Sequence, residues 1–127
     1  MNMKRLLSGF ALTCAMVGTA QADDLLASGP VYGGPLQTRV ACQVFNAGSV
    51  PITFVKTQIS SQALVVVPLT FNNCVALAPN RTCTFQAVAD NQGFSCKVVT
   101  LGSATQVRGT MAALNASAAL LSEAALR

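Results

Sequence analysis

The sequence predicts an all-β protein, an antiparallel β-sandwich of about seven short strands. Apolar and polar side chains alternate in short segments that are rich in β-branched and aromatic residues, which is the pattern of half-buried strands. Turn-forming residues separate these segments at intervals of roughly 8–12 residues. Strands do not alternate with helical segments, as a parallel sheet would require, so antiparallel pairing is expected.

The first residues have the pattern of an export signal. A basic start (residues 1–5) leads into an apolar run (residues 6–17), and a small-residue pattern ends at Ala22. This pattern predicts cleavage between Ala22 and Asp23. The apolar run is too short and too interrupted to span a bilayer, so no transmembrane segment is expected after cleavage.

Removal of the signal peptide, residues 1–22, leaves 127 − 22 = 105 residues, enough for a single domain (residues 23–127) with one modest core. This part has a net charge of 6 − 4 = +2, and its charges are scattered singly along the chain. Neither a nucleic-acid-binding patch nor a polybasic membrane patch is therefore expected.

The first two strands are predicted around residues 31–32 and over residues 37–46. The first is a short edge strand that ends in the Gly-Gly-Pro turn at residues 33–35, because the segment holds too much glycine and proline for a helix. The second alternates, and its apolar face consists of Val40, Cys42 and Val44.

The next two strands are predicted over residues 51–59 and 64–71. The former is rich in β-branched residues and begins at Pro51, a position where no ladder donor is needed. The latter is apolar enough for the core, but Pro68 removes a backbone donor and indicates an edge or a bulge.

Three further strands are predicted over residues 82–89, 94–101 and 105–114. A Pro-Asn turn at residues 77–82 precedes the first, and a turn at residues 90–93 separates it from the second. The alanine- and leucine-rich tail that follows, beginning at Asn115, predicts a short C-terminal helix or a frayed end.

Four cysteines remain after the expected cleavage: Cys42, Cys74, Cys83 and Cys96. An even number of cysteines in a small exported domain is typical of disulfides, so two bridges are expected. A four-thiolate zinc site is the alternative, but the sequence has neither a C-x-x-C pair nor a histidine.

The strand pattern predicts which cysteines pair. Cys42 and Cys96 each stand two residues from apolar neighbours, so both are expected to point inward and to bridge the sheets, as one disulfide does in immunoglobulin domains. Cys74 and Cys83 flank the Pro-Asn turn, which can bring them together. If the strands of Cys83 and Cys96 formed a direct hairpin, the two residues would be offset by about 13 Å, beyond the ~7 Å Cα separation that a bridge allows.

Histidine and paired carboxylates, on which acid–base catalysis usually depends, are absent or scarce, so no catalytic activity is predicted. The chain has no histidine, and its acidic residues lie at the expected N-terminus (Asp23 and Asp24), in one turn (Asp90) and in the tail (Glu123). Bridged cysteines would offer no free thiol nucleophile. No phosphate-binding loop is present, and neither a cofactor nor a metal is expected.

The central part of the chain, roughly residues 40–111, resembles a group of small exported bacterial proteins with an immunoglobulin-like β-sandwich, two disulfides and no established activity. The resemblance depends on five motifs: Cys42-x-Val44-x-Asn46-x-Gly48, Pro51-Ile52-Thr53-Phe54, Leu77-Ala78-Pro79-x-x-Thr82-Cys83, Cys96-Lys97-Val98 and Val107-Arg108-Gly109-Thr110-Met111. It implies bridging roles for the cysteines and no catalytic role. The chain lacks the core tryptophan of true immunoglobulin domains, and Phe94 stands where their tyrosine corner needs a hydroxyl.

We therefore expect an exported protein, periplasmic or extracellular, that binds an unknown protein or glycan partner in the cell envelope. The leading expectation is an interaction or structural module. One alternative is a subunit of a surface fibre or adhesin that assembles by strand addition at an open sheet edge. Another is a carbohydrate-binding module, which would need aromatic side chains exposed on one sheet face.

Overall fold

The computed structural model describes residues 23–127, so the expected signal peptide and Ala22 lie outside the described residues. All regular elements of the described part are strands. They are β1 (Asp24–Ala27), β2 (Arg39–Asn46), β3 (Ile52–Ser61), β4 (Val66–Val67), β5 (Phe71–Asn72), β6 (Ala76–Leu77), β7 (Thr82–Val88), β8 (Phe94–Thr100), β9 (Val107–Leu114) and β10 (Leu120–Leu126).

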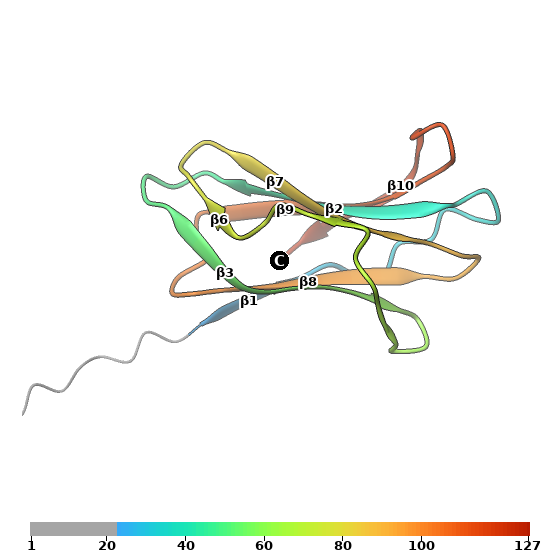
Figure 1. Ribbon diagram of the computed structural model, residues 1–127, viewed down its shortest axis with the longest axis horizontal. Helices are drawn as coiled ribbons and strands as arrows, with labels where there is room; N and C mark the ends of the chain where they lie inside the picture. Colours follow the sequence, from blue (N-terminus) through green and yellow to red (C-terminus); the bar gives the residue numbers. More distant parts are fainter. Residues whose placement is uncertain (1–22) are drawn as a thin grey trace, which may run out of the picture.

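The strands form two antiparallel sheets packed face to face (Figure 1). One sheet has the order β1-β8-β3-β4, with β6 also paired to β3, and the other has the order β10-β9-β2-β7-β5. Alternate side chains of each central strand point into the space between the sheets, which is the consequence of a two-residue repeat. The predicted all-β sandwich is confirmed.

The sheet order resembles that of immunoglobulin domains at the centre and differs from it at the flanks. In those domains the first and second strands share a sheet, and the last strand lies beside the sixth. The two central pairs, β2 with β7 and β3 with β8, correspond to the pairing of the second strand with the fifth and of the third with the sixth in those domains. At the flanks, however, β9 pairs with β2, and β1 pairs with β8.

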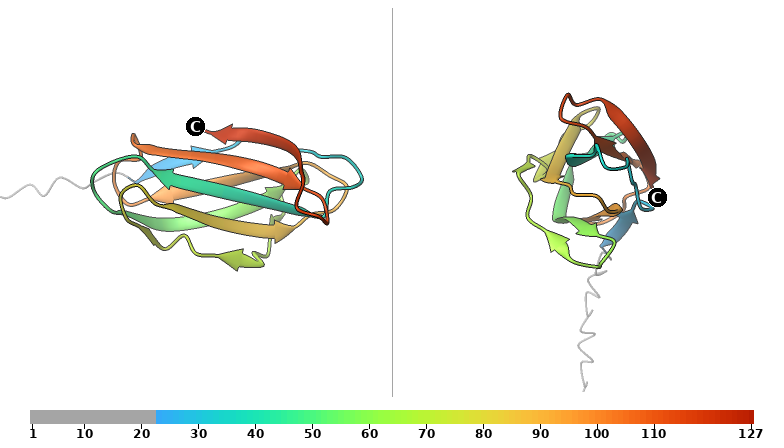
Figure 2. Two further views of the ribbon diagram at one scale, coloured as in Figure 1. Left: turned by 90° about the horizontal axis from the view of Figure 1, so that it is seen from above. Right: turned by 90° about the vertical axis from the view of Figure 1, so that its right-hand side faces the viewer.

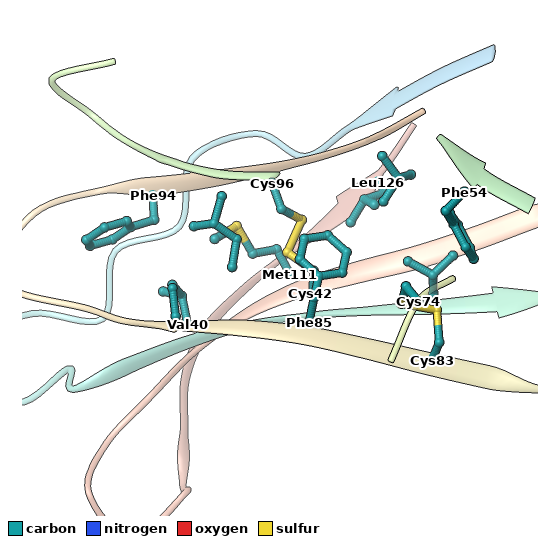
Figure 3. Packing of buried hydrophobic residues seen from close by; sticks show 14 of the residues in the cluster. Val40, Cys42, Phe54, Cys74, Cys83, Phe85, Phe94, Cys96, Met111 and Leu126 are labelled. Carbon is teal, nitrogen blue, oxygen red and sulfur yellow. A yellow bond between two sulfur atoms is a disulfide. The ribbon is translucent and has the colours of Figure 1, made fainter. Parts of the chain in front are cut away.

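The core lies between the two sheets and is filled by side chains from both (Figure 3). The largest fully buried side chains are Phe85, Phe94, Ile59 and Met111, and valines surround them. Full burial of an apolar side chain of this size stabilises the fold by about 1.5–3 kcal/mol.

One side of the sandwich is closed by backbone hydrogen bonds between the two ends of the described chain. The N–H of Ala27 donates to the carbonyl oxygen of Arg127 (3.0 Å), and the N–H of Arg127 donates back to that of Ala27 (3.1 Å). The segment after β1 continues this closure, because Val31 is buried and forms an isolated bridge with Phe94. The edge strand expected around residues 31–32 is therefore reduced to this bridge, and β1 is an additional strand.

On the opposite side, the chain crosses from one sheet to the other. The segment 64–71, expected as one strand, forms two short strands instead: β4 pairs with β3, and β5 pairs with β7 (Figures 1 and 2). Pro68 lies between them and cannot donate a ladder hydrogen bond, which favours a break at this point.

The tail forms a strand, so the prediction of a C-terminal helix or a frayed end was wrong. β10 pairs along its length with β9, and its last residue, Leu126, is buried in the core. An isolated helix of about a dozen residues is marginal in water. Pairing with the otherwise open edge of β9 satisfies the backbone and buries Leu126 at the same time.

The two ends of the sandwich carry different groups of turns. Asp24 lies at one end, where its carboxylate accepts a hydrogen bond from the N–H of Ala104 in the β8–β9 loop (2.7 Å). The β3–β4 and β7–β8 turns lie at the other end, on the right in Figure 1. At the Asp24 end, the buried side chain of Asn46 donates to the carbonyl oxygens of Val50 and Leu77 and thereby ties three segments together.

Candidate functional site

The four cysteines form the two expected bridges. Cys42 of β2 is bonded to Cys96 of β8 across the sandwich, with Cα atoms 6.5 Å apart. Cys74 is bonded to Cys83, with Cα atoms 5.2 Å apart. The hairpin register used against a Cys83–Cys96 pair does not apply, since β7 and β8 lie in different sheets. Two disulfides indicate that the protein resides in an oxidising compartment.

The acidic residues are dispersed. Asp24 and Asp90 lie at opposite ends of the sandwich, and Glu123 lies on β10. Within residues 23–127, no group of three or more histidine, cysteine or acidic side chains could hold a metal ion. Nor does this part of the chain contain a helix that is long and apolar enough to cross a membrane.

A groove of about 360 Å³ opens at the end of the sandwich that carries the β3–β4 and β7–β8 turns, and we call it the end groove. One wall consists of alternate residues of the β3–β4 hairpin, and the other consists of residues that end β7 and form the β7–β8 turn. The lining residues are Ser61, Ala63, Val65, Val67, Val88, Asp90, Gln92 and Phe94. The groove is therefore mostly apolar, with one carboxylate.

Aliphatic side chains at and beside the end groove are exposed to solvent. Leu64 is 89% exposed, Val88 is 69% exposed, and Val65 and Val66 are each more than half exposed. Val65 and Val88 belong to the lining of the groove, whereas Leu64 and Val66 adjoin it in the β3–β4 hairpin. Single exposed apolar residues are ordinary on a protein surface, but these four gather at one end of the sandwich. The sequence pattern predicts a core strand over residues 64–71, and this exposed apolar surface was therefore not expected.

The β3–β4 turn holds Leu64 in a strained backbone conformation. The N–H of Leu64 donates to the carbonyl oxygen of Ser61 (2.9 Å), and the N–H of Ser61 donates to that of Val65 (2.8 Å), which closes a three-residue hairpin loop. Such a loop places its last residue in the left-handed region, where glycine is favoured, and Leu64 has a φ of 62°. A leucine there costs about 1 kcal/mol or more.

The opposite wall is held by a buried glutamine. Gln37 is 4% exposed, and its side-chain amide donates to the carbonyl oxygens of Asp90 (2.6 Å) and Gln92 (2.7 Å). Its side-chain oxygen accepts a hydrogen bond from the N–H of Gly33 (3.0 Å). Because this amide binds both residues of the β7–β8 turn that line the groove, it fixes the position of that wall.

Asp90 presents the only charged side chain of the end groove. Both of its carboxylate oxygens accept hydrogen bonds from the side-chain amide of Gln92, at 2.8 and 2.9 Å. No lining residue is basic, so the carboxylate has no cationic partner within the groove. Next to it, the hydroxyl of Tyr32 donates to the side-chain oxygen of Asn91.

Two sheet edges beside the end groove have unpaired backbone groups. Val66 faces Ser60, next to the hydrogen-bonded Ser61–Val65 pair, so its N–H and C=O point away from β3. On β7, the carbonyl oxygens of Thr84 and Gln86 accept hydrogen bonds from the N–H groups of Asn73 and Thr70, which flank β5. The N–H and C=O of Val88, two residues after Gln86, point to the same side, but β5 pairs only with Phe85 and Gln86 and does not reach Val88.

The aromatic residues of the described part do not form one exposed platform. Phe54, Phe85 and Phe94 are buried in the core. Phe45 and Phe71 are partly exposed, but they pair with Thr82 and Gln86 of β7, four residues or roughly 13 Å apart along that strand. Tyr32 is exposed as well, and it lies beside Asn91 of the β7–β8 turn. A second hollow of about 310 Å³, on the outer face of β3 and β8, has no aromatic lining; it is lined by Ala27, Gln58, Ser60, Leu64, Ser95, Cys96 and Lys97.

Comparisons with family models, curated proteins and solved structures give no match to this chain.

Proposed function

We propose that this protein is an exported, disulfide-stabilised interaction module without catalytic activity, and that it binds a protein partner through the end groove. The observation that carries this proposal is the exposed apolar surface at and beside a hollow whose walls are held in place: Val65 and Val88 line the hollow, and Leu64 and Val66 adjoin it in the β3–β4 hairpin. Clustered exposed apolar side chains are typical of interaction sites. The export pattern before Asp23 and the two disulfides support a periplasmic or extracellular location.

Leu64 supports the same proposal through its energetic cost. In the folded domain its side chain is almost fully hydrated and its backbone is strained, so it contributes to stability in neither respect. Strained residues that the fold does not need are frequent at binding sites. A partner that fills the end groove and also covers the adjoining β3–β4 turn would bury Leu64 and offset the cost of its exposure.

Site-directed photo-crosslinking tests the proposed function. The full chain, with the photoreactive residue p-benzoylphenylalanine at position 88, is expressed in its native host and irradiated. We expect a discrete adduct of higher mass in the envelope or secreted fraction. The matched control carries the same residue at position 43, because Gln43 is exposed on β2 away from the end groove. Equal labelling at both positions, or none at position 88, would contradict the proposal.

A second candidate function is that of a fibre subunit, and the unpaired edges at Val66 and Val88 favour it. A strand from another copy would then occupy the end groove. Light scattering during gel filtration, over a hundredfold range of concentration, distinguishes the two functions. Oligomers that grow with concentration and resist mild detergent would support the fibre, and a constant monomer mass would exclude it.

A further inference from the structure

We propose that the occupant of the end groove is an extended segment of a partner protein, with apolar residues at alternate positions and one basic residue, which adds as a β-strand. This inference rests on the function proposed above and specifies the chemistry of the partner. It depends on the unpaired sheet edges, the apolar lining and the single carboxylate of the groove.

The unpaired edges provide the main-chain contacts. Val66 and Val88 each direct an N–H and a C=O away from their own sheets, where no strand of residues 23–127 pairs with them. An extended peptide matches such groups at the strand spacing, and peptide binding by strand addition uses these main-chain hydrogen bonds for affinity.

The lining selects the side chains of the segment. Val65, Val67, Val88 and Phe94 are the large apolar residues of the lining. Because successive side chains of a strand point to opposite faces, alternate residues of an added strand would enter the hollow and the others would face solvent. Apolar residues at the alternate positions fit this lining.

The carboxylate of Asp90 selects the charge. It is exposed at the groove, its hydrogen-bond partner is the neutral amide of Gln92, and no basic residue lines the groove. A lysine or arginine in the segment would complement this charge, whereas an acidic residue would be repelled. The carboxylate therefore favours a segment with a basic residue over a segment with an acidic one.

A second copy of this chain fits the site less well than a foreign segment. Every extended stretch of seven residues or more in the described part, namely β2, β3, β7, β8, β9 and β10, is already paired within its own sheets. A second copy would have to break one of these pairings to supply the segment. A partner with an unpaired extended segment has no such cost.

Peptide titration followed by nuclear magnetic resonance tests the inference on the oxidised chain, residues 23–127. The probe is an end-blocked seven-residue peptide in which valine at the odd positions alternates with threonine at the even positions, and lysine replaces the valine at position seven so that it lies on the same face as the other valines. We expect shifts at the amide and methyl signals of Val65, Val66 and Val88, together with slower hydrogen exchange of the Val66 and Val88 amides. Slower exchange distinguishes strand addition from contact by side chains alone.

Two altered probes separate the parts of the inference. N-methylation of the two central valines removes main-chain donors and should weaken binding by about tenfold or more. Glutamate in place of lysine should weaken it by up to about fivefold, which is the range of a partly exposed ion pair. Asp90→Asn should remove the preference for lysine, whereas Glu123→Gln, an exposed change on β10, should leave it unchanged.

The outcomes also distinguish failure of this inference from failure of the proposed function. Equal binding of the methylated probe, or no peptide binding at millimolar concentration, overturns strand addition even if crosslinking at position 88 captures a protein. A dimer that forms through the end groove overturns the choice of a foreign segment. Absence of crosslinking at position 88 refutes the proposed function itself.

Discussion

At the residue scale, two turns of the same type contain a strained residue. The β3–β4 turn and the β9–β10 turn have the same pair of closing hydrogen bonds, and each places a residue other than glycine at positive φ, namely Leu64 and Ala118. In the second turn, the side-chain oxygen of Asn115 also accepts bonds from two backbone N–H groups. The two turns therefore form a matched pair, one beside the end groove and one outside its lining.

Glycine at either strained position is expected to stabilise the domain. Leu64→Gly and Ala118→Gly should each raise the free energy of unfolding by about 0.5–1 kcal/mol, because relief of strain exceeds the added entropy of the unfolded chain. Urea unfolding measures this gain. Only Leu64→Gly should also weaken partner binding, and a loss of binding by Ala118→Gly would contradict the role given to Leu64.

Gln37 is expected to hold the wall of the end groove. Gln37→Ala removes three hydrogen bonds from a buried position and should lower the free energy of unfolding by about 1–3 kcal/mol. Hydrogen exchange of the β7–β8 turn should accelerate as well. Gln43→Ala, an exposed change on β2, is the control and should remain within about 0.5 kcal/mol of the parent protein. Unchanged exchange in the turn would show that Gln37 does not hold it.

At the element scale, β10 shows how sheet pairing overrides local preference. Its alanines and leucines favour a helix, but the open edge of β9 offers a ladder of hydrogen bonds along the whole segment. The segment of β4 and β5 is a second example. Its residues favour one continuous strand, but Pro68 interrupts it and the two short strands pair in different sheets. Pairing partners, rather than intrinsic propensity, decide both elements.

The contribution of β10 depends on its buried terminal leucine. Leu126 is 6% exposed, so Leu126→Ala should lower the free energy of unfolding by about 2–5 kcal/mol. Leu120→Ala, at the exposed start of the same strand, should change it by less than about 0.5 kcal/mol. Thermal unfolding followed by circular dichroism compares the two, and similar melting temperatures would show that β10 is not part of the core.

At the scale of the whole molecule, two crosslinks supplement a modest core. The Cys42–Cys96 bridge spans 54 residues of sequence and joins the two sheets, while the Cys74–Cys83 bridge spans nine residues. Loop-closure entropy assigns about 4.2 kcal/mol to the first and about 2.7 kcal/mol to the second. Together they are comparable with the ~5–15 kcal/mol stability of a typical domain.

Loss of the two bridges should therefore have unequal effects. The Cys42→Ala/Cys96→Ala variant should lose more stability than the Cys74→Ala/Cys83→Ala variant, and reduction of both bridges should unfold the domain or bring it close to unfolding. Urea unfolding of the two variants, and melting of the parent protein with and without a reductant, provide the comparison. A reversed order, or an unchanged melting curve after reduction, would contradict the role of the bridges.

The sequence by itself determined the all-β class, the main strands and the inward direction of Cys42 and Cys96, because a two-residue alternation and strong turn signals are local properties of the chain. Only the tertiary structure decided that β9 lies beside β2, that the tail becomes β10, and that residues 64–67 border a groove. Each of these depends on which edges remain unpaired when the sheets meet, and no local pattern contains that information. The end groove, made by turns about thirty residues apart, exists only in the folded molecule.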